Sequence, residues 1–175
     1  MNAISNVVFV LDNIADYPTL LNEMPENAAV HLLNADDNAL QQMADVLANY
    51  NNLDAIHLFS HGSSGALDLG AYTLNSENLN EHSETLTQIG RALSPTGDIL
   101  LYGCDVAQGE TGLAFISKLA TATQADIAAS DTPTGHTAFQ GDWTLEQLQG
   151  PIEAAVLAVE GWAGVLGTLQ ISGVP

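Results

Sequence analysis

Two residue types that can do chemistry together stand at the ends of two apolar segments. The segment 55–60 ends in His61, and the segment 98–102 leads through Gly103 to Cys104. Both segments have the composition of buried parallel strands, and open parallel sheets bind ligands beyond the carboxyl ends of their strands. A cysteine nucleophile needs a nearby imidazole to take or hold its proton. We therefore predict that His61 and Cys104 form a catalytic pair on neighbouring strands.

Such a pair also needs N–H donors for the oxyanion of acyl transfer. The backbone N–H groups of Gly62 and Cys104 are the predicted donors, because both follow a strand into a tight turn. Gly62 and Gly103 lack a Cβ, so the backbone can approach a substrate closely at both positions. Asp105 is expected to cap the turn or the next helix, because its charge would raise the thiol pKa if it pointed inward.

Other kinds of site fit the residues less well. His57 and His61 form an HxxxH pattern, but on a strand they are separated by roughly 13 Å, too far for one zinc ion. The HGSSG segment does not have the spacing of a serine nucleophile elbow. Dinucleotide, P-loop and calcium-loop patterns are absent, so no cofactor or metal is expected. The alternatives are purely structural roles: Cys104 as a thiol packed at a strand end, and His61 as a turn residue that is hydrogen-bonded to the backbone.

The elements that must position these residues alternate along the chain. Apolar runs predict strands at 7–11, 28–33, 55–60, 98–102 and 125–129, an edge strand at 142–148 and a small hairpin over 66–74. Apolar residues at three-to-four spacing predict helices at 39–50, at 77–93 and around 113–120, after a short helix opened by Asp16 and Pro18. This order predicts a three-layer α/β/α sandwich with a mostly parallel central sheet.

The sequence changes in character at Pro151. A helical apolar pattern follows, and then a tail punctuated by glycines. We expect residues 1–150 to form one α/β domain, and residues 151–175 to form a C-terminal helix and exit segment that leads to downstream domains.

Charge and length narrow the function classes. The 175 residues carry a net charge of −19, with Arg91 and Lys118 as the only basic residues. Without cations to displace counterions, the chain is not expected to bind nucleic acid or anionic lipid. No apolar stretch is long enough to cross a membrane, and the first residues do not resemble a signal peptide, so export would need a signal outside this segment. With Cys104 as the only cysteine, no internal disulfide is possible.

Two motifs carry a resemblance to known families. The segments AIHLFSHG and ILLYGCDVAQG look like the His-Gly and Cys signatures of caspase-like (clan CD) cysteine peptidases, which include caspases, gingipains, separase and CHAT domains. Over roughly Val7 to Trp162 the chain more closely resembles the DUF4347 domain of very large bacterial surface or secreted proteins. The segments that carry it are VVFVLDNIADYPTLL, LDAIHLFSHGSSGALDLG, DILLYGCDVAQGETG, ADIAASDTPTG and GDWTLE.

The resemblance implies a caspase-like fold, a location outside the cell or at its surface, Cys104 as the nucleophile and His61 as the general base or imidazolium partner. In several clan members the segment after the fifth strand helps to line the S1 pocket. Here that segment begins with Ser130 and Asp131, and Ser60 is a further substrate-binding candidate. An acidic Asp131 would favour a basic P1 side chain in a downstream or separate target. If the enzyme instead cuts its own exit segment, P1 is uncharged and Asp131 is not the selector.

We therefore predict a caspase-like cysteine endopeptidase that uses no cofactor and processes a large secreted or surface bacterial protein. Its partner would be a peptide or protein substrate, including its own downstream chain, with no membrane insertion. The alternative is an inactive caspase-fold cap or interaction module at the N-terminus of a giant adhesin-like protein.

Overall fold

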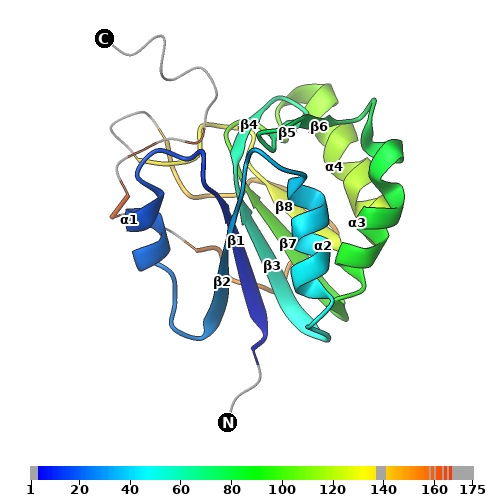
Figure 1. The fold of residues 1–175 in the computed structure, drawn as a ribbon. Helices are drawn as coiled ribbons and strands as arrows, with labels where there is room; N and C mark the ends of the chain where they lie inside the picture. Colours follow the sequence, from blue (N-terminus) through cyan, green and yellow to red (C-terminus); the bar gives the residue numbers. More distant parts are fainter. Residues whose placement is uncertain are drawn as a thin grey trace.

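A six-stranded sheet forms the centre of the computed structural model, which describes residues 4–136, 141–157, 159, 161, 162, 164 and 166. The strand order is β2-β1-β3-β7-β8-β9, and only β9 runs antiparallel to its neighbour (Figure 1). The prediction of an α/β fold with a mostly parallel central sheet is confirmed. The strands are β1 (Asn6–Leu11), β2 (Ala28–Leu33), β3 (Leu53–Phe59), β7 (Leu93–Tyr102), β8 (Asp126–Ala129) and β9 (Gln147–Gln149).

The two faces of this sheet are covered differently. Helices α2 (Ala39–Leu47), α3 (Ser83–Gly90) and α4 (Gly109–Thr123) pack on one face (Figure 1). The short helix α1 (Tyr17–Asn22) and the chain after β9 lie on the other face. There, ring contacts connect four aromatic side chains, those of Phe59, Tyr102, Trp143 and Trp162. The sheet is thus covered by three helices on one face, and by α1, an aromatic cluster and irregular chain on the opposite face.

A second, smaller sheet stands beyond the carboxyl end of β3. It is antiparallel and consists of β4 (His61–Ser63), β5 (Ala66–Asp68) and β6 (Thr73–Asn75). The hairpin predicted over 66–74 is therefore present. Its turn contains Gly70 with φ +86, and a Cβ there would collide with the backbone of Ala35. The short strand β4 was not predicted, and His61 is its first residue.

The helix predicted over 77–93 is shorter than its apolar spacing suggested. A 3₁₀ turn, η1 (Leu79–His82), precedes α3, and α3 ends at Gly90. A Cβ at Gly90 would collide with the carbonyl of Thr123, so this residue allows α3 to approach the end of α4 closely. Strand β7 then begins at Leu93, five residues before the predicted start, and the pairing register with β3 shifts between Leu53 and Ala55.

The predicted helical pattern after Pro151 does not form a helix at any described residue. Instead the chain here is irregular, and the side chains of Val159, Trp162 and Leu166 are each buried in the main core. The indole N–H of Trp162 donates to the carbonyl of Ala15 at 2.9 Å, which fastens this segment beside α1. The edge strand predicted at 142–148 is also shorter and forms only over β9.

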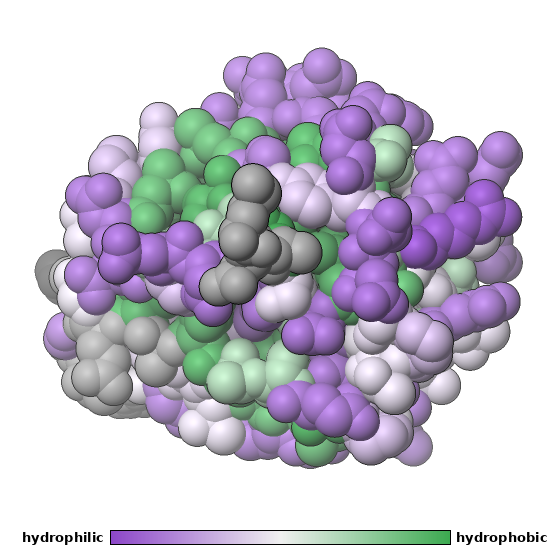
Figure 2. Space-filling model, turned by 90° about the horizontal axis from the view of Figure 1, so that it is seen from below, coloured by the Kyte–Doolittle hydropathy of each residue, from purple (hydrophilic) through white to green (hydrophobic). Residues whose placement is uncertain are grey.

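Figure 2 shows the surface of the molecule at the end where the parallel strands begin. On this surface, hydrophobic and hydrophilic residues lie side by side. Within the part of the chain that the structure describes, no helix combines the length and the apolar character needed to span a bilayer.

Candidate functional site

The loops that follow β3 and β7 touch each other. Phe59 and Tyr102 are the last paired residues of these strands, and the N–H of Ser60 donates to the carbonyl of Tyr102 at 3.1 Å. A Cβ on Gly103 would lie 3.1 Å from the carbonyl oxygen of Ser60 and 3.4 Å from the Cα of Gly62. The prediction that the two strands are neighbours is confirmed, and the glycine allows their loops to meet.

Two backbone N–H groups of these loops point at one oxygen atom. The N–H groups of Gly62 and Cys104 both donate to the carbonyl oxygen of Leu166, at N···O distances of 3.0 and 3.3 Å. They are the two groups that the sequence nominated as oxyanion donors. Their shared acceptor belongs to the C-terminal segment of the same chain, which the sequence analysis did not place there.

The segment that carries Leu166 is held like an added strand. The N–H of Leu166 donates to the carbonyl of Thr134, and the N–H of His136 donates to the carbonyl of Gly164, both at 2.8 Å. The Leu166 side chain is 0 % exposed and belongs to the main core cluster. Main-chain pairing with one buried anchor is a recurrent way in which proteins bind extended peptides.

The thiol of Cys104 lies under this segment and is only 3 % exposed. Its Sγ accepts a hydrogen bond from the N–H of Thr134 at 3.1 Å and donates to the carbonyl of the same residue at 3.5 Å. Burial raises the pKa of Cys104 to about 11. The hydrogen bond with the Thr134 backbone lowers this pKa by a smaller amount, and the charge of Asp105 raises it by a still smaller amount. At pH 7 only about one thiol in ten thousand is therefore ionised.

His61 is the other half of the predicted pair. It is half-buried at the start of β4, and its Nδ1 is buried without a hydrogen-bond partner among the described residues. Because buried polar atoms nearly always have a partner, an unpaired ring nitrogen requires an explanation, and a role in chemistry is one.

Two of the three predicted substrate-binding residues are hydrogen-bonded to side chains at the start of β9. Ser130 is buried, and its Oγ donates to Glu146 at 2.9 Å, while Oδ2 of Asp131 accepts from the Gln147 amide at 2.8 Å. This loop is joined to the turn around Cys104 through the N–H of Asp105, which donates to the carbonyl of Thr132 at 3.1 Å.

Ser60, the remaining predicted substrate-binding residue, is fully buried, and its Oγ has no partner among the residues described. Glu146, which fastens the Ser130 loop, was not identified from the sequence. A lone Glu before β9 carries no motif.

His57, the other histidine of the HxxxH pattern, has a structural role. Its Nδ1 is 2.9 Å from the Tyr102 hydroxyl and its Nε2 is 2.9 Å from Oδ1 of Asn6. Oδ1 of Asn6 can only accept, so Nε2 of His57 carries the proton and donates to it. In the neutral ring Nδ1 then accepts from the Tyr102 hydroxyl, which itself accepts from the N–H of Leu157. Burial lowers the pKa of His57 to about 4, which keeps this ring neutral.

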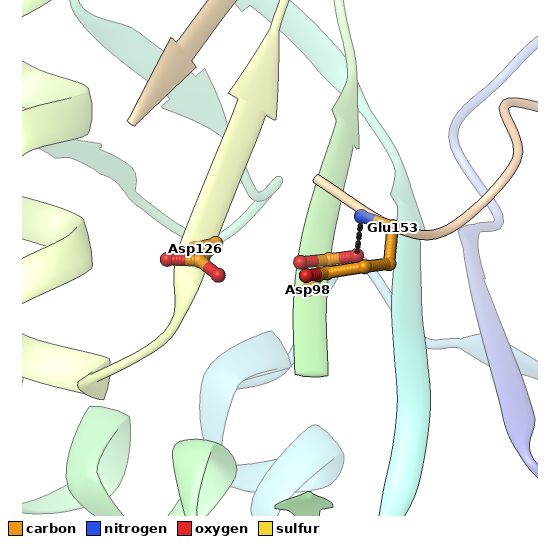
Figure 3. Close-up of side chains that lie close together, drawn as sticks. All are labelled: Asp98, Asp126 and Glu153. Carbon is orange, nitrogen blue, oxygen red and sulfur yellow. Dashed lines mark hydrogen bonds between the residues drawn. The ribbon is translucent and has the colours of Figure 1, made fainter. Parts of the chain in front are cut away.

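A group of three carboxylates lies toward the end of the molecule where the strands begin (Figure 3). Asp98 on β7 pairs with Asp126 on β8, and Glu153 lies alongside Asp98; one oxygen atom of each lies within 4.8 Å of the others. Oδ2 of Asp98 accepts from the N–H groups of Glu153 and Ala154, both at 2.8 Å. Oδ1 is buried and has no partner in the described part of the chain. The sequence analysis missed this group because its members come from three separate elements.

Comparisons with known proteins identify the family and little more. No curated protein matches the chain. Two solved structures are similar to it in part. One is a small-chain dehydrogenase, with 12% sequence identity, coverage of 68% of this chain and 77% of that one, and a TM-score of 0.35. The other is a short chain dehydrogenase family protein from Francisella tularensis subsp. tularensis SCHU S4, with 10% identity, coverage of 73% and 70%, and a TM-score of 0.36.

Likeness at these TM-scores carries no conclusion about activity. The family comparison covers far more of the chain, because residues 7–166 match the family described as "Domain of unknown function (DUF4347)". The chain belongs to the DUF4347 family.

Proposed function

We propose that this protein is a cysteine endopeptidase of the caspase-like kind, with Cys104 as nucleophile and His61 as general base. The observation that carries the proposal is the pair of N–H groups, from Gly62 and Cys104, that meet on one peptide carbonyl oxygen beside the only thiol. Acyl transfer needs such donors, because negative charge develops on the carbonyl oxygen as the nucleophile adds.

The neutral thiol defines the task of the histidine. With a pKa of about 11, Cys104 holds its proton at neutral pH, so the proton must leave as sulfur attacks. His61 offers an unpartnered ring nitrogen at the neighbouring strand end. General-base catalysis by a positioned imidazole contributes about 10²- to 10⁴-fold to such a step. We propose this role for His61, followed by protonation of the leaving amine.

A second candidate function is a non-catalytic module, in which the fold is kept and the chemistry is lost. The observations that favour it are the raised pKa of Cys104 and the hydrogen bonds of its Sγ to the Thr134 backbone. In this case the segment around Leu166 would simply close the domain. By its resemblance to domains of large bacterial proteins, the chain would act within a larger secreted or surface protein in either case.

The dependence on His61 separates the two functions. The test treats the native chain with a peptidyl acyloxymethyl ketone and follows adduct formation by intact mass. The peptidase proposal expects His61→Ala to slow labelling at least about a hundredfold, while His82→Ala, a change of another histidine, leaves the rate unchanged. Equal rates for wild type and His61→Ala, with both proteins folded by circular dichroism, would support the non-catalytic module and overturn the proposal.

A further inference from the structure

We infer that the substrate is the chain itself, and that the bond cut is Leu166–Gly167. This inference rests on the proposed function. The carbonyl held by the two N–H groups is that of Leu166, so an attack assisted by these donors would cut the bond on the carboxyl side of Leu166.

The backbone register supports this assignment. The hydrogen bonds Leu166 to Thr134 and His136 to Gly164 place residues 164 and 166 in an extended conformation along 134–136. In this pairing Leu166 takes the P1 position and Gly164 the P3 position. A Cβ on Gly164 would collide with the ring of Trp162, so the glycine at P3 allows the segment to bend back over its own tryptophan.

The burial of Leu166 sets the expected selectivity. Its side chain is 0 % exposed within the main core, so the P1 position requires a large apolar side chain. Asp131, the sequence-based candidate for selecting a basic P1 side chain, has its carboxylate bonded to Gln147. A carboxylate at P1 would be buried away from water in the core, which disfavours an acidic side chain at this position.

The reaction balances without any further reactant except water. The sulfur of Cys104 bonds to the carbonyl carbon of Leu166 and its proton passes to His61. The bond to the nitrogen of Gly167 breaks, and His61 returns the proton to the leaving amine. Water then attacks the thioester, which leaves a carboxylate on Leu166 and restores the thiol.

The test is intact-mass analysis of the purified 175-residue chain over time in reducing buffer at pH 8. The expected products are a chain that ends at Leu166 and the peptide GTLQISGVP, residues 167–175. Cys104→Ala should stop the cut. Leu166→Asp should slow it at least tenfold, whereas Leu148→Asp, the same change at a leucine that is 53 % exposed, should not.

If the Leu166→Asp chain fails to fold, Gly167→Pro serves as a second variant. It keeps the Leu166 side chain and changes only the residue that supplies the nitrogen of the Leu166–Gly167 bond. This variant is expected to stay uncut. A Cys104-dependent cut at another bond, or an uncut wild-type chain in which His61 still accelerates probe labelling, overturns this inference and leaves the peptidase proposal standing. Equal labelling rates for wild type and His61→Ala overturn both this inference and the peptidase proposal.

We also propose, from a separate observation, that Asp98, Asp126 and Glu153 bind a divalent cation through oxygen, calcium being the best match. Asp98 is 0 % exposed, and its Oδ1 has no partner among the described residues, although its Oδ2 has two. In Figure 3 the carboxylates of Asp98 and Glu153 overlap in the view, and Asp126 lies on the neighbouring strand. Ligands of one calcium ion lie up to about 5 Å apart, given bonds of about 2.3–2.6 Å, and the three carboxylates meet this limit.

The site has an approach and a structural consequence. Glu153 is exposed and also lines an open cavity of about 480 Å³, so an ion can enter from solvent. Gly150, with φ +90, brings the chain after β9 so close that a Cβ would collide with the Asp126 carboxylate. A bound cation would join this chain, which continues toward Leu166, to β7 and β8.

The test is calorimetric titration of the EDTA-treated chain with CaCl₂, together with thermal unfolding. Saturable one-site binding and a raised Tm are expected for wild type. Asp126→Asn and Glu153→Gln should each weaken binding at least tenfold, and Asp36→Asn, which removes an exposed carboxylate away from the group and from this cavity, should not. Absence of saturable binding, or equal binding by all four proteins, overturns the proposal.

Discussion

Alkylation of Cys104 is expected to accelerate about tenfold for every pH unit between pH 8 and pH 10. The structure places its thiol in the core under the segment that carries Leu166, and burial raises its pKa to about 11 from an ordinary value of 9.0. At pH 8 the ionised fraction is then about 0.1 %, against about 10 % for an ordinary thiol, a difference of about a hundredfold.

Intact mass after treatment with iodoacetamide measures this, because the chain has one cysteine. A Cys104→Ala chain treated in the same way measures the alkylation of other groups, which is subtracted. Limited access slows every rate by the same factor, so the slope against pH reports the ionisation alone. The same chain in 8 M urea is the control and should level off near pH 9.

Two results would contradict the reasoning. A native rate that is already constant between pH 7 and pH 9 would mean that Cys104 rests as a thiolate, paired with His61. A native rate that levels off near pH 9, as in urea, would mean that labelling proceeds through unfolded chains. In the first case His61 would act as a charged partner and not as a base during the attack.

Three further predictions concern stability and the approach of loops. The pKa of the buried His57 is lowered to about 4, so the unfolded chain takes up a proton at this residue before the folded chain does. The free energy of unfolding should therefore be full above pH 6.5 and fall by up to about 3 kcal/mol as the pH drops toward 4. Urea unfolding at pH 7 and pH 4.5 should show a smaller loss of this free energy in His57→Gln than in wild type. Gly90→Ala should lower the free energy of unfolding by more than about 1 kcal/mol, because its Cβ would meet the carbonyl of Thr123; an unchanged Tm would contradict this. Gly62→Ala should slow probe labelling with little loss of secondary structure, because its Cβ would lie 2.6 Å from Val106 and displace the N–H that holds Leu166; a wild-type labelling rate would show that this N–H does not matter.

The strands around the site could be predicted from sequence because their signal is local. The apolar runs before His61 and Cys104 identify buried parallel strands, and the parallel pairing of β3 with β7 then sets the two loops side by side. Glycine at positions 62 and 103 was expected to let the backbone approach a substrate, whereas in the structure these glycines let the two loops approach each other.

The position of Leu166 could not be predicted because its partners are distant in sequence and its local pattern indicates another structure. Val159, Trp162 and Leu166 recur at helical spacing, yet Gly161 and Gly164 weaken a helix, and each apolar side chain is buried from irregular chain. Asp98 had the same difficulty. Asp98 is a buried strand residue, and nothing in the sequence around it indicates that Glu153 returns to it.

The burial of Leu166 has a consequence for turnover. A cut after this residue leaves the new chain end where the main-chain pairing and the side chain already hold it, at an effectively intramolecular concentration. Its carboxylate would stay against the two N–H donors and compete with other polypeptides for the site. After the proposed cut, the chain would therefore act more slowly on a second substrate than on itself.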